Sequence, residues 1–354
     1  MPFRFRHAPA LHRCLGMSRA IKRRICRVQR QFLLATLVFL LVSACSGNRL
    51  NTASQNGTAS PTVQSATSAC RTIKHVMGET CVPAIPERIV TLDYFALENV
   101  LALGMKPVGT VLNQDLTEER ADLRERLTEV ENLGSVDQPN LEKILALKPD
   151  LILGIKTTRE KIYPQLSQIA PTVLSDFDSS ADWKEILKLH AEALGKTETA
   201  KQVMDDYYSR LEKFKAQMGD RLSQTEVSVV RITPQGLILY MKDIFIGTIL
   251  EDAELPRPPA QDKDSWSEEI SKERIRDADG DVIFLWSNEV GDQEQEIQTA
   301  LAKLKADPLW SQLNAVKQGK VFEVPRYWIG SSILAANAVI DDLFKYLVEK
   351  KSSE

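Results

Sequence analysis

Histidine is scarce in this sequence, with only four among 354 residues. After residue 45 only His75 and His190 remain. So few imidazole groups give little support to a protein-held metal site or to a Ser-His-Asp catalytic triad. The sequence therefore predicts no metal ligands and no catalytic residues of these kinds.

Several enzyme signatures are also missing. The sequence contains neither of the glycine-rich phosphate-binding loops G-x-G-x-x-G and G-x-x-x-x-G-K-[ST]. It also lacks the zinc-hydrolase motif H-E-x-x-H and the nucleophile-elbow motif G-x-S-x-G. Carboxylates are plentiful, but spacing singles out none as a catalytic pair. A two-lobed hydrolase or transferase at the cell surface stays open as an alternative, which a buried carboxylate dyad in a cleft would favour.

Acidic side chains are absent from the first 45 residues, which carry nine of the 45 Lys and Arg residues. The only long apolar run there, residues 32–42 (FLLATLVFLLV), is too short to cross a bilayer, which takes about 20 residues. This pattern is typical of a secretory signal. The basic part is complete from Arg19 onward, so Met17 is an alternative start to Met1.

The signal ends in Ser43-Ala44-Cys45, which resembles the lipobox of bacterial lipoproteins. That resemblance implies that Cys45 becomes the lipidated N-terminal residue. The alternative is an incidental thiol beside an ordinary cleavage site. Residues 46–69 are rich in Ser, Thr, Asn and Gly and almost free of apolar side chains, which indicates a flexible tether.

The remaining body is acidic, because 36 basic residues stand against 48 acidic ones after residue 45. An acidic surface argues against binding to nucleic acid. The body has two cysteines, Cys70 and Cys81, on either side of Gly78. In an exported chain this spacing predicts a disulfide that clips a β-hairpin, although two free thiols or a metal site are alternatives.

From Arg88 onward, short apolar runs alternate with helical patterns, as in "LILGI" after "NLEKILALKPD". Strands without polar alternation are buried on both faces, which is typical of parallel α/β sheets. The predicted fold is therefore two Rossmann-like α/β lobes with mostly parallel sheets, joined by one long α-helix. We predict a lipoprotein signal peptide (1–44), a flexible tether (45–69), a first lobe with the clipped hairpin (70–195), a connecting helix (196–222) and a second lobe (223–354).

A sequence repeat supports two similar lobes. The stretch "NLEKILALKPDLILG" (140–154) has the same form as "SKERIRDADGDVIFLW" (271–286), at a constant offset of 131 residues. Glu142 matches Glu273, and Asp150 matches Asp281. Glu142 and Glu273 would each lie in a first helical turn, where an acid favours the helix dipole by ~0.3–1 kcal/mol.

Arginines and aromatic residues follow many of the predicted strands. In open α/β sheets, ligands bind outside the carboxyl ends of the strands. Guanidinium groups hold carboxylates or other oxyanions by forked hydrogen bonds, and rings stack on apolar parts of a ligand. The predicted ligand-binding residues are Tyr94, Arg159, Arg231, Tyr240, Trp286, Arg326, Tyr327 and Trp328. Each could instead be an ordinary surface or core residue, least so Arg231 in its apolar strand.

From about Val82 to its end, the chain resembles the helical-backbone (class III) periplasmic binding proteins of ABC importers, which carry ferric siderophores, vitamin B12 or haem. The resemblance rests on the order and spacing of "PERIVTLD", "LALGMKPVG", "NLEKILALKPDLILG", "TREKIYPQLSQIAPTV", "ISKERI…DGDVIFL" and "YWIGSSILAANAVIDDLFKYL". Its segments "VVRI", "LPRPPAQ" and "WIGSSILAANAVIDDL" look most like the ferric-siderophore branch.

The resemblance implies a monomeric lipoprotein, anchored through Cys45 on the periplasmic side of the plasma membrane or on the outer cell surface. It would capture an iron(III)–siderophore complex and deliver it to an ABC permease dimer with its ATPase. Glu142 and Glu273 would dock on permease arginines, one per lobe. Iron would enter only inside the ligand, so no cofactor is implied. The alternative cargo is cobalamin or haem.

Overall fold

The computed structural model describes residues 70–112, 121–287 and 294–349. The predicted signal peptide and the whole predicted tether, including Cys45, lie outside the described residues. Residues Ala66–Glu354 cluster as one compact unit. In the part of the chain that the structure describes, no helix combines the length and apolarity needed to cross a membrane.

The first sheet contains only parallel strands, in the order β5-β4-β3-β6-β7. Its inner strand β6 has no polar alternation in its sequence LILGI, and all five of its residues are buried. Parallel strands covered on both faces have this composition. The strands are β3 (Ile89–Thr91), β4 (Gly109–Thr110), β5 (Glu131–Asn132), β6 (Leu151–Ile155) and β7 (Thr172–Ser175).

Helices cover both faces of this sheet. Ile89 and Leu153 pack with α2 and α8 on one face, whereas Val90 and Ile152 pack with α5 and α7 on the other. The helices are α2 (Tyr94–Ala102), α4 (Ala121–Arg126), α5 (Leu141–Leu147), α6 (Lys156–Arg159), α7 (Tyr163–Ile169) and α8 (Trp183–Leu194). Short 3-10 turns η1 (Glu160–Ile162) and η2 (Ser180–Asp182) lie between them.

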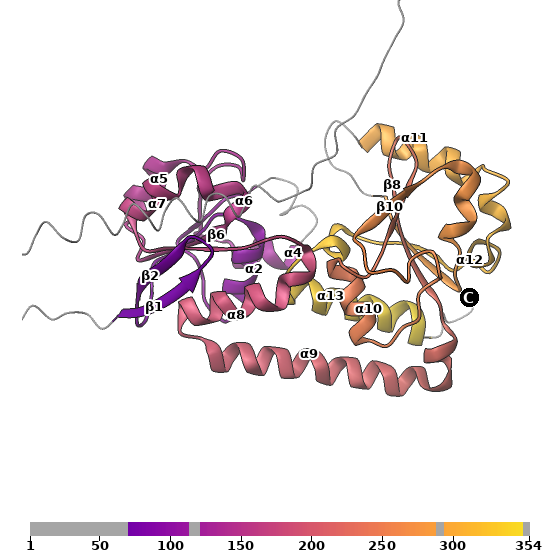
Figure 1. The fold of residues 1–354 in the computed structure, drawn as a ribbon, viewed down its shortest axis with the longest axis horizontal. Helices are drawn as coiled ribbons and strands as arrows, with labels where there is room; N and C mark the ends of the chain where they lie inside the picture. The colour runs from indigo at the N-terminus through magenta and orange to yellow at the C-terminus, as the bar shows by residue number, and fades with distance from the viewer. Residues whose placement is uncertain (1–69, 113–120, 288–293, 350–354) are drawn as a thin grey trace, which may run out of the picture. The chain divides into compact units, whose positions relative to one another are not determined.

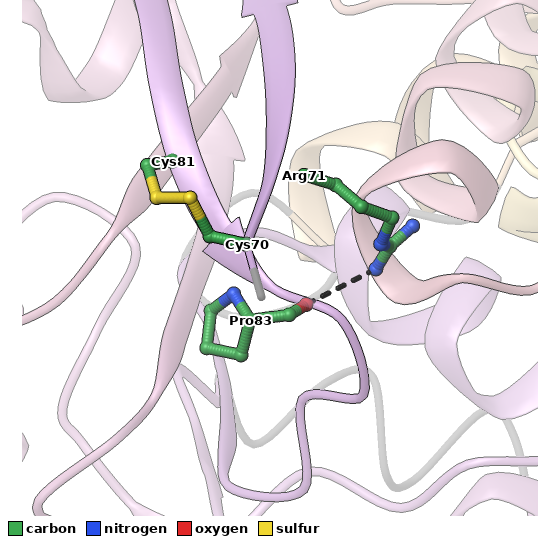
Figure 2. Close-up of a disulfide and its surroundings, with 4 residues drawn as sticks. All are labelled: Cys70, Arg71, Cys81 and Pro83. Carbon is green, nitrogen blue, oxygen red and sulfur yellow. Dashed lines mark hydrogen bonds between the residues drawn. A yellow bond between two sulfur atoms is a disulfide. The ribbon is translucent and has the colours of Figure 1, made fainter. Parts of the chain in front are cut away.

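A two-stranded hairpin precedes the first sheet and carries the predicted disulfide. Strands β1 (Cys70–His75) and β2 (Gly78–Pro83) pair antiparallel, and Cys70 is bonded to Cys81. Figure 2 shows Arg71 of β1 donating from Nη2 to the carbonyl of Pro83, the last residue of β2, at 3.2 Å. The same guanidinium donates to the carbonyls of Glu192 and Ala193 at the end of α8. The hairpin is thereby attached to α8 just before the connecting helix begins.

The connecting helix α9 (Thr197–Met218) corresponds to the one long α-helix that the sequence predicts. It is followed by the 3-10 turn η3 (Gly219–Gln224). At 1.5 Å per residue its 22 residues extend about 33 Å. It forms because its apolar residues recur every three or four positions, so that Tyr207, Leu211 and Phe214 are all buried along one face. Figure 1 shows it as one uninterrupted helix.

The second sheet is mixed, in the order β10-β9-β8-β11-β12. Strands β8, β11 and β12 are parallel, whereas β9 returns antiparallel to β8 through the tight turn at residues 233–236. The strands are β8 (Val227–Ile232), β9 (Leu237–Tyr240), β10 (Ser267–Ile270), β11 (Val282–Trp286) and β12 (Val321–Glu323). The two five-stranded sheets on either side of α9 confirm the predicted fold.

The second sheet also has helices on both faces (Figure 1). Helices α10 (Phe245–Asp252) and α13 (Ile333–Leu343) cover one face, and α11 (Glu294–Lys305) and α12 (Asn314–Lys317) the other. The remaining turns are the 3-10 segments η4 (Lys272–Ala278), η6 (Trp310–Gln312) and η7 (Arg326–Ile329), and the π-helical η8 (Phe344–Val348).

The sequence repeat corresponds to the same local structure in both lobes. The Asp150 carboxylate accepts hydrogen bonds from the backbone N–H groups of Glu87 and Arg88, just before β3. Asp281 accepts one from Glu226, just before β8. Each aspartate therefore fixes the start of its own strand to the start of the neighbouring strand. This explains why an aspartate recurs directly before each buried strand.

One apolar core continues from the first sheet to the second. It includes Trp183 of α8, Tyr207 and Phe214 of α9, Phe245 of α10 and Val339 of α13, all 0% exposed. The Trp183 ring lies edge-on to those of Tyr207 and Phe245, at centroid distances of 5.4 and 5.9 Å. The two lobes therefore share this core, and each has a further apolar cluster of its own on the other face of its sheet.

Polar contacts also join the helices that form the shared core. Asp252 Oδ2 on α10 lies 2.6 Å from Lys184 Nζ on α8 and accepts a 2.7 Å hydrogen bond from the Tyr207 hydroxyl on α9. Ser332, the residue before α13, donates to the Glu98 carboxylate on α2. Elements from both lobes are thus joined by charged and neutral hydrogen bonds around the apolar core.

The buried His190 on α8 predicts an acid-sensitive stability. It is 0% exposed, and burial lowers its pKa to about 4. Between its unfolded pKa of 6.5 and about pH 4, the unfolded chain binds a proton that the folded protein excludes, so stability falls as pH falls through this window. At about 1.4 kcal/mol per pKa unit the loss approaches ~3 kcal/mol.

We expect His190→Gln, which keeps a hydrogen-bonding group near the Asn99 amide, to remove this part of the acid loss. The measurement is urea unfolding of both proteins at pH 7.5 and pH 4.5. An equal fall in stability for both proteins would show that His190 does not cause it.

Candidate functional site

The carboxyl edge of the first sheet carries a pair of stacked aromatic rings. Phe95 lies in the first turn of α2, after β3, and Phe177 lies just after β7. Their centroids are 4.8 Å apart with an interplanar angle of 12°. Both side chains are half-buried, and neither belongs to the core clusters of the described residues. The predicted Tyr94 precedes Phe95 and is also half-buried.

Asp93 is the buried N-cap residue of α2, directly before Tyr94 and Phe95. It is 2% exposed, and its Oδ1 caps α2 by accepting from the Ala96 N–H at 2.8 Å. Burial raises the pKa of Asp93 to about 6, opposed by the Ala96 hydrogen bond and the charge of Arg159. The cap therefore fixes the start of the helix that carries Tyr94 and Phe95.

Arg159, which was predicted to contact ligand, lies in the interior of the first lobe. Its side chain is 1% exposed, and Nη2 donates to the Leu92 carbonyl at 2.6 Å and to the Val136 carbonyl. Nη1 also donates to a backbone oxygen, that of Thr158, so both terminal nitrogens of this buried cation are used within the protein. Arg159 therefore positions the loops after β3 and β5.

The second sheet places a cation directly over an indole ring. Arg231 and Trp286 are register partners on β8 and β11, so their side chains share one face of the sheet. The guanidinium carbon of Arg231 lies 4.2 Å from the Trp286 ring centroid. Arg231 is half-buried and Trp286 is 3% exposed. Trp286 is the last residue of β11 and Arg231 the last but one of β8, so the pair lies at the carboxyl ends of both strands.

The Trp286 indole N–H is a buried donor. No acceptor for Nε1 lies among the residues that the structure describes. Leaving such a group without a hydrogen bond costs about 1–3 kcal/mol. A hydrogen-bond acceptor placed beside this pair would therefore interact with both the Arg231 guanidinium and the Trp286 indole N–H.

Tyr240 was predicted at the same edge, and the structure places it elsewhere. Because β9 runs antiparallel to β8, its last residue lies away from the carboxyl end of β8, beyond the Val230–Leu239 pair. Tyr240 is 6% exposed, with its ring 6.5 Å from that of Trp286. It supports Trp286 from the interior. The two-residue loop Pro234-Gln235 could have revealed this, since parallel strands need a longer crossover.

The three predicted residues after β12 differ in burial. Trp328 is 0% exposed, its Nε1 donates to Asp342 Oδ2 at 2.8 Å, and its ring lies 4.2 Å from that of Phe284. Trp328, which was predicted to contact ligand, therefore packs in the core. The Tyr327 hydroxyl donates to the same Asp342 oxygen at 2.7 Å. Arg326 is exposed.

The two repeat-matched acids are both exposed. Glu142 lies in the first turn of α5 and Glu273 in that of η4, while the neighbouring Ile144 and Ile275 are buried. The basic residue after each acid is already paired. Lys143 Nζ lies 2.7 Å from Glu131 Oε1, and Arg274 Nη2 lies 2.7 Å from Asp277 Oδ2.

Neither Glu142 nor Glu273 forms a salt bridge with another described residue. The pKa of Glu273 is lowered, first by a hydrogen bond with the Ser271 side chain and then by a backbone hydrogen bond. Its carboxylate is therefore ionised at neutral pH. Each lobe thus presents one charged acid whose charge is not neutralised locally.

Sequence reasoning missed Phe95 and Phe177. Phe95 immediately follows the predicted Tyr94, and Phe177 is two residues beyond the end of β7, so the rule used for the other strands could have found both. Among the described residues, no group of three or more His, Cys, Asp or Glu side chains could hold a metal ion. The candidate side chains at the two sheet edges are aromatic and cationic.

Known proteins share this sequence and fold. A family model described as periplasmic binding protein matches residues 89–327. The probable siderophore-binding lipoprotein YfiY of Bacillus subtilis (strain 168) is 36% identical over 330 residues, which cover 90% of this chain and 97% of that protein. The putative ABC transporter substrate-binding lipoprotein YhfQ of the same strain is 28% identical, over 79% of this chain and 89% of that protein.

A solved structure is similar as well. The crystal structure of Staphylococcus aureus SirA complexed with staphyloferrin B has a TM-score of 0.68 and 30% sequence identity, covering 78% of this chain and 98% of that chain. The family match spans most of the two lobes and the helix between them. The chain therefore belongs to the periplasmic binding protein family, whose members are substrate-binding proteins of transporters and not enzymes.

Proposed function

We propose that this chain is the substrate-binding lipoprotein of an ABC importer and that it captures an iron(III)–siderophore complex for delivery to the membrane permease. The relatives support the cargo, because YfiY is named as siderophore-binding and SirA was solved with staphyloferrin B. YhfQ supports the transporter class, since it is named as an ABC transporter substrate-binding lipoprotein. The two lipoprotein names also support anchoring of this chain through Cys45.

The observation that carries the proposal is the Arg231 guanidinium held 4.2 Å over the Trp286 ring at the carboxyl end of β8. An iron chelate with ionised oxygen donors has a negative rim that a guanidinium and an indole N–H can hydrogen-bond. Its organic backbone has apolar surface, which stacks on rings. The Phe95–Phe177 pair offers such rings at the corresponding edge of the first sheet.

The proposed ligand-contacting set is accordingly smaller than the predicted one. It keeps the residues that lie at strand carboxyl ends with surface or an open donor, and adds the stacked phenylalanines. It consists of Tyr94, Phe95, Phe177, Arg231, Trp286, Arg326 and Tyr327. The iron stays inside its chelator, so the protein supplies no metal ligands and needs no cofactor. The receptor acts as a monomer.

Removal of the Arg231 charge tests the cargo site. We expect Arg231→Gln to weaken binding of a ferric siderophore about tenfold or more, because a charge-assisted hydrogen bond contributes ~1.5–3 kcal/mol. The measurement is quenching of tryptophan fluorescence by ferric hydroxamate, catecholate and carboxylate chelates, with cobalamin and haem alongside. Arg276→Gln is the matched control, since Arg276 is an exposed arginine in η4 of the same lobe and is not among the proposed ligand-contacting residues.

Equal affinities for wild type and Arg231→Gln would remove this residue from the site. Tight binding of cobalamin or haem, without binding of any ferric siderophore, would contradict the proposed cargo.

The proposed docking acids require a separate test. Glu142 and Glu273 would pair with basic side chains of the permease, one per lobe, while the ligand site is untouched. We expect Glu142→Gln with Glu273→Gln to leave ferric-chelate affinity unchanged and to lower uptake of radioactive iron in cells by tenfold or more, since close interfacial charge pairs couple by ~1.5–7 kcal/mol.

The control for this test is a second pair of acids that begin helices. Glu185 and Glu294 are exposed and lie in the first turns of α8 and α11. Their change to Gln removes the same helix-dipole interaction without touching the repeat. Equal uptake by the two double variants would show that Glu142 and Glu273 are only helix-start residues.

A further inference from the structure

An apolar cavity opens beside Glu273 on the second lobe. It encloses about 290 Å³ between the β8–β9 turn, the start of η4 and helix α11. This is roughly twice the ~150 Å³ that suffices to bind benzene. Its base is formed by the buried side chains of Ile232, Leu237, Ile270, Ile275 and Leu304.

The cavity is separate from the proposed ligand site. Ile232 lines it, and Arg231 precedes Ile232 on β8. Successive side chains of a strand point to opposite faces, so the cavity lies on the face away from the Arg231–Trp286 pair. The core clusters agree, because Ile232 packs with Leu301 of α11 while Trp286 belongs to the cluster that contains α10 and α13.

Two residues that line the cavity directly precede Glu273 in the sequence. Ser271 and Lys272 line it and directly precede Glu273, and the Ser271 side chain hydrogen-bonds the Glu273 carboxylate. The Lys272 charge at the rim is already neutralised, since Nζ lies 2.6 Å from Asp307 Oδ2. A basic group that pairs with Glu273 therefore meets an ionised acid, and the residues next to that basic group lie over the apolar cavity.

From this arrangement we infer that the cavity is the anchor site for the ABC permease: it takes one apolar side chain, aromatic or branched aliphatic, from the permease segment whose basic residue pairs with Glu273. The inference rests on the proposed docking role of Glu273. A buried apolar anchor supplies the affinity that an exposed charge pair lacks, while the charge pair supplies orientation.

The first lobe presents a different surface at the equivalent place. Leu145 follows Glu142 by one helical turn and is 60% exposed, and the 131-residue offset places Arg276 at its counterpart in the second lobe. One lobe thus offers a protruding leucine beside its acid, and the other offers a cavity. The surfaces beside the two repeat-matched acids therefore differ between the lobes.

Filling the cavity tests the inference. Ala300 on α11 lines the cavity, whereas Ala302 is exposed on the same helix and does not line it. We expect Ala300→Phe to weaken binding of the loaded receptor to its permease–ATPase complex in nanodiscs by about tenfold, which is the size of a buried anchor's contribution. Ala302→Phe is expected to bind as wild type. Ferric-chelate affinity and melting temperature are measured for both variants.

Glu273→Gln in the same assay separates the two ideas. If Glu273→Gln weakens docking and a folded Ala300→Phe does not, the cavity inference is wrong and the docking proposal stands. If Glu273→Gln has no effect, the docking proposal itself fails.

A second measurement covers the case in which Ala300→Phe unfolds. A photo-crosslinking residue replaces Lys303, which is exposed at the cavity rim, or Ala302 as the control. Crosslinking to the permease from position 303 and not from 302 supports the inference. Crosslinking to a second copy of the receptor, or equal crosslinking from both positions, overturns it.

Discussion

The apolar core shared by the two lobes is the constraint on which the rest of the structure depends. Trp183, Tyr207 and Phe245 come from α8, α9 and α10, and each is 0% exposed. Truncation of one such aromatic side chain typically costs ~3–5 kcal/mol, a large part of the stability of a protein. Separating the lobes would expose this surface and would break the Lys184–Asp252 ion pair, so large relative movements of the lobes are costly.

This constraint determines how the protein uses its sheets. Because side chains of α8, α9 and α10 pack in one core, the carboxyl ends of the strands in the two sheets keep nearly the same distance from each other. A few side chains at these strand ends are then enough to contact a ligand. Arg231 over Trp286 and the stacked Phe95–Phe177 pair are suited to a large anionic complex with apolar parts. Glu142 and Glu273 lie in the first turns of α5 and η4, and neither belongs to the residues proposed to contact cargo.

Much of this architecture could be predicted from the sequence, because it depends on local patterns. The buried strand LILGI, the α9 periodicity and the 131-residue repeat each reflect spacing along the chain. The site was predicted less well, because burial depends on neighbours distant in sequence. Arg159 is covered by the Leu92 and Val136 loops, and Trp328 by Asp342 and Phe284. Tyr240 was misplaced because the direction of β9 was not considered.

The distance between the lobes, with and without cargo, tests the shared-core account most directly. Residues 46–354 contain only the disulfide-bonded cysteines Cys70 and Cys81, so spin labels can be placed on Lys161→Cys and Gln298→Cys, both exposed and one in each lobe. The account predicts one narrow distance distribution that moves by less than its own width when a ferric siderophore is added. Two populations, or a displacement larger than that width, would contradict it.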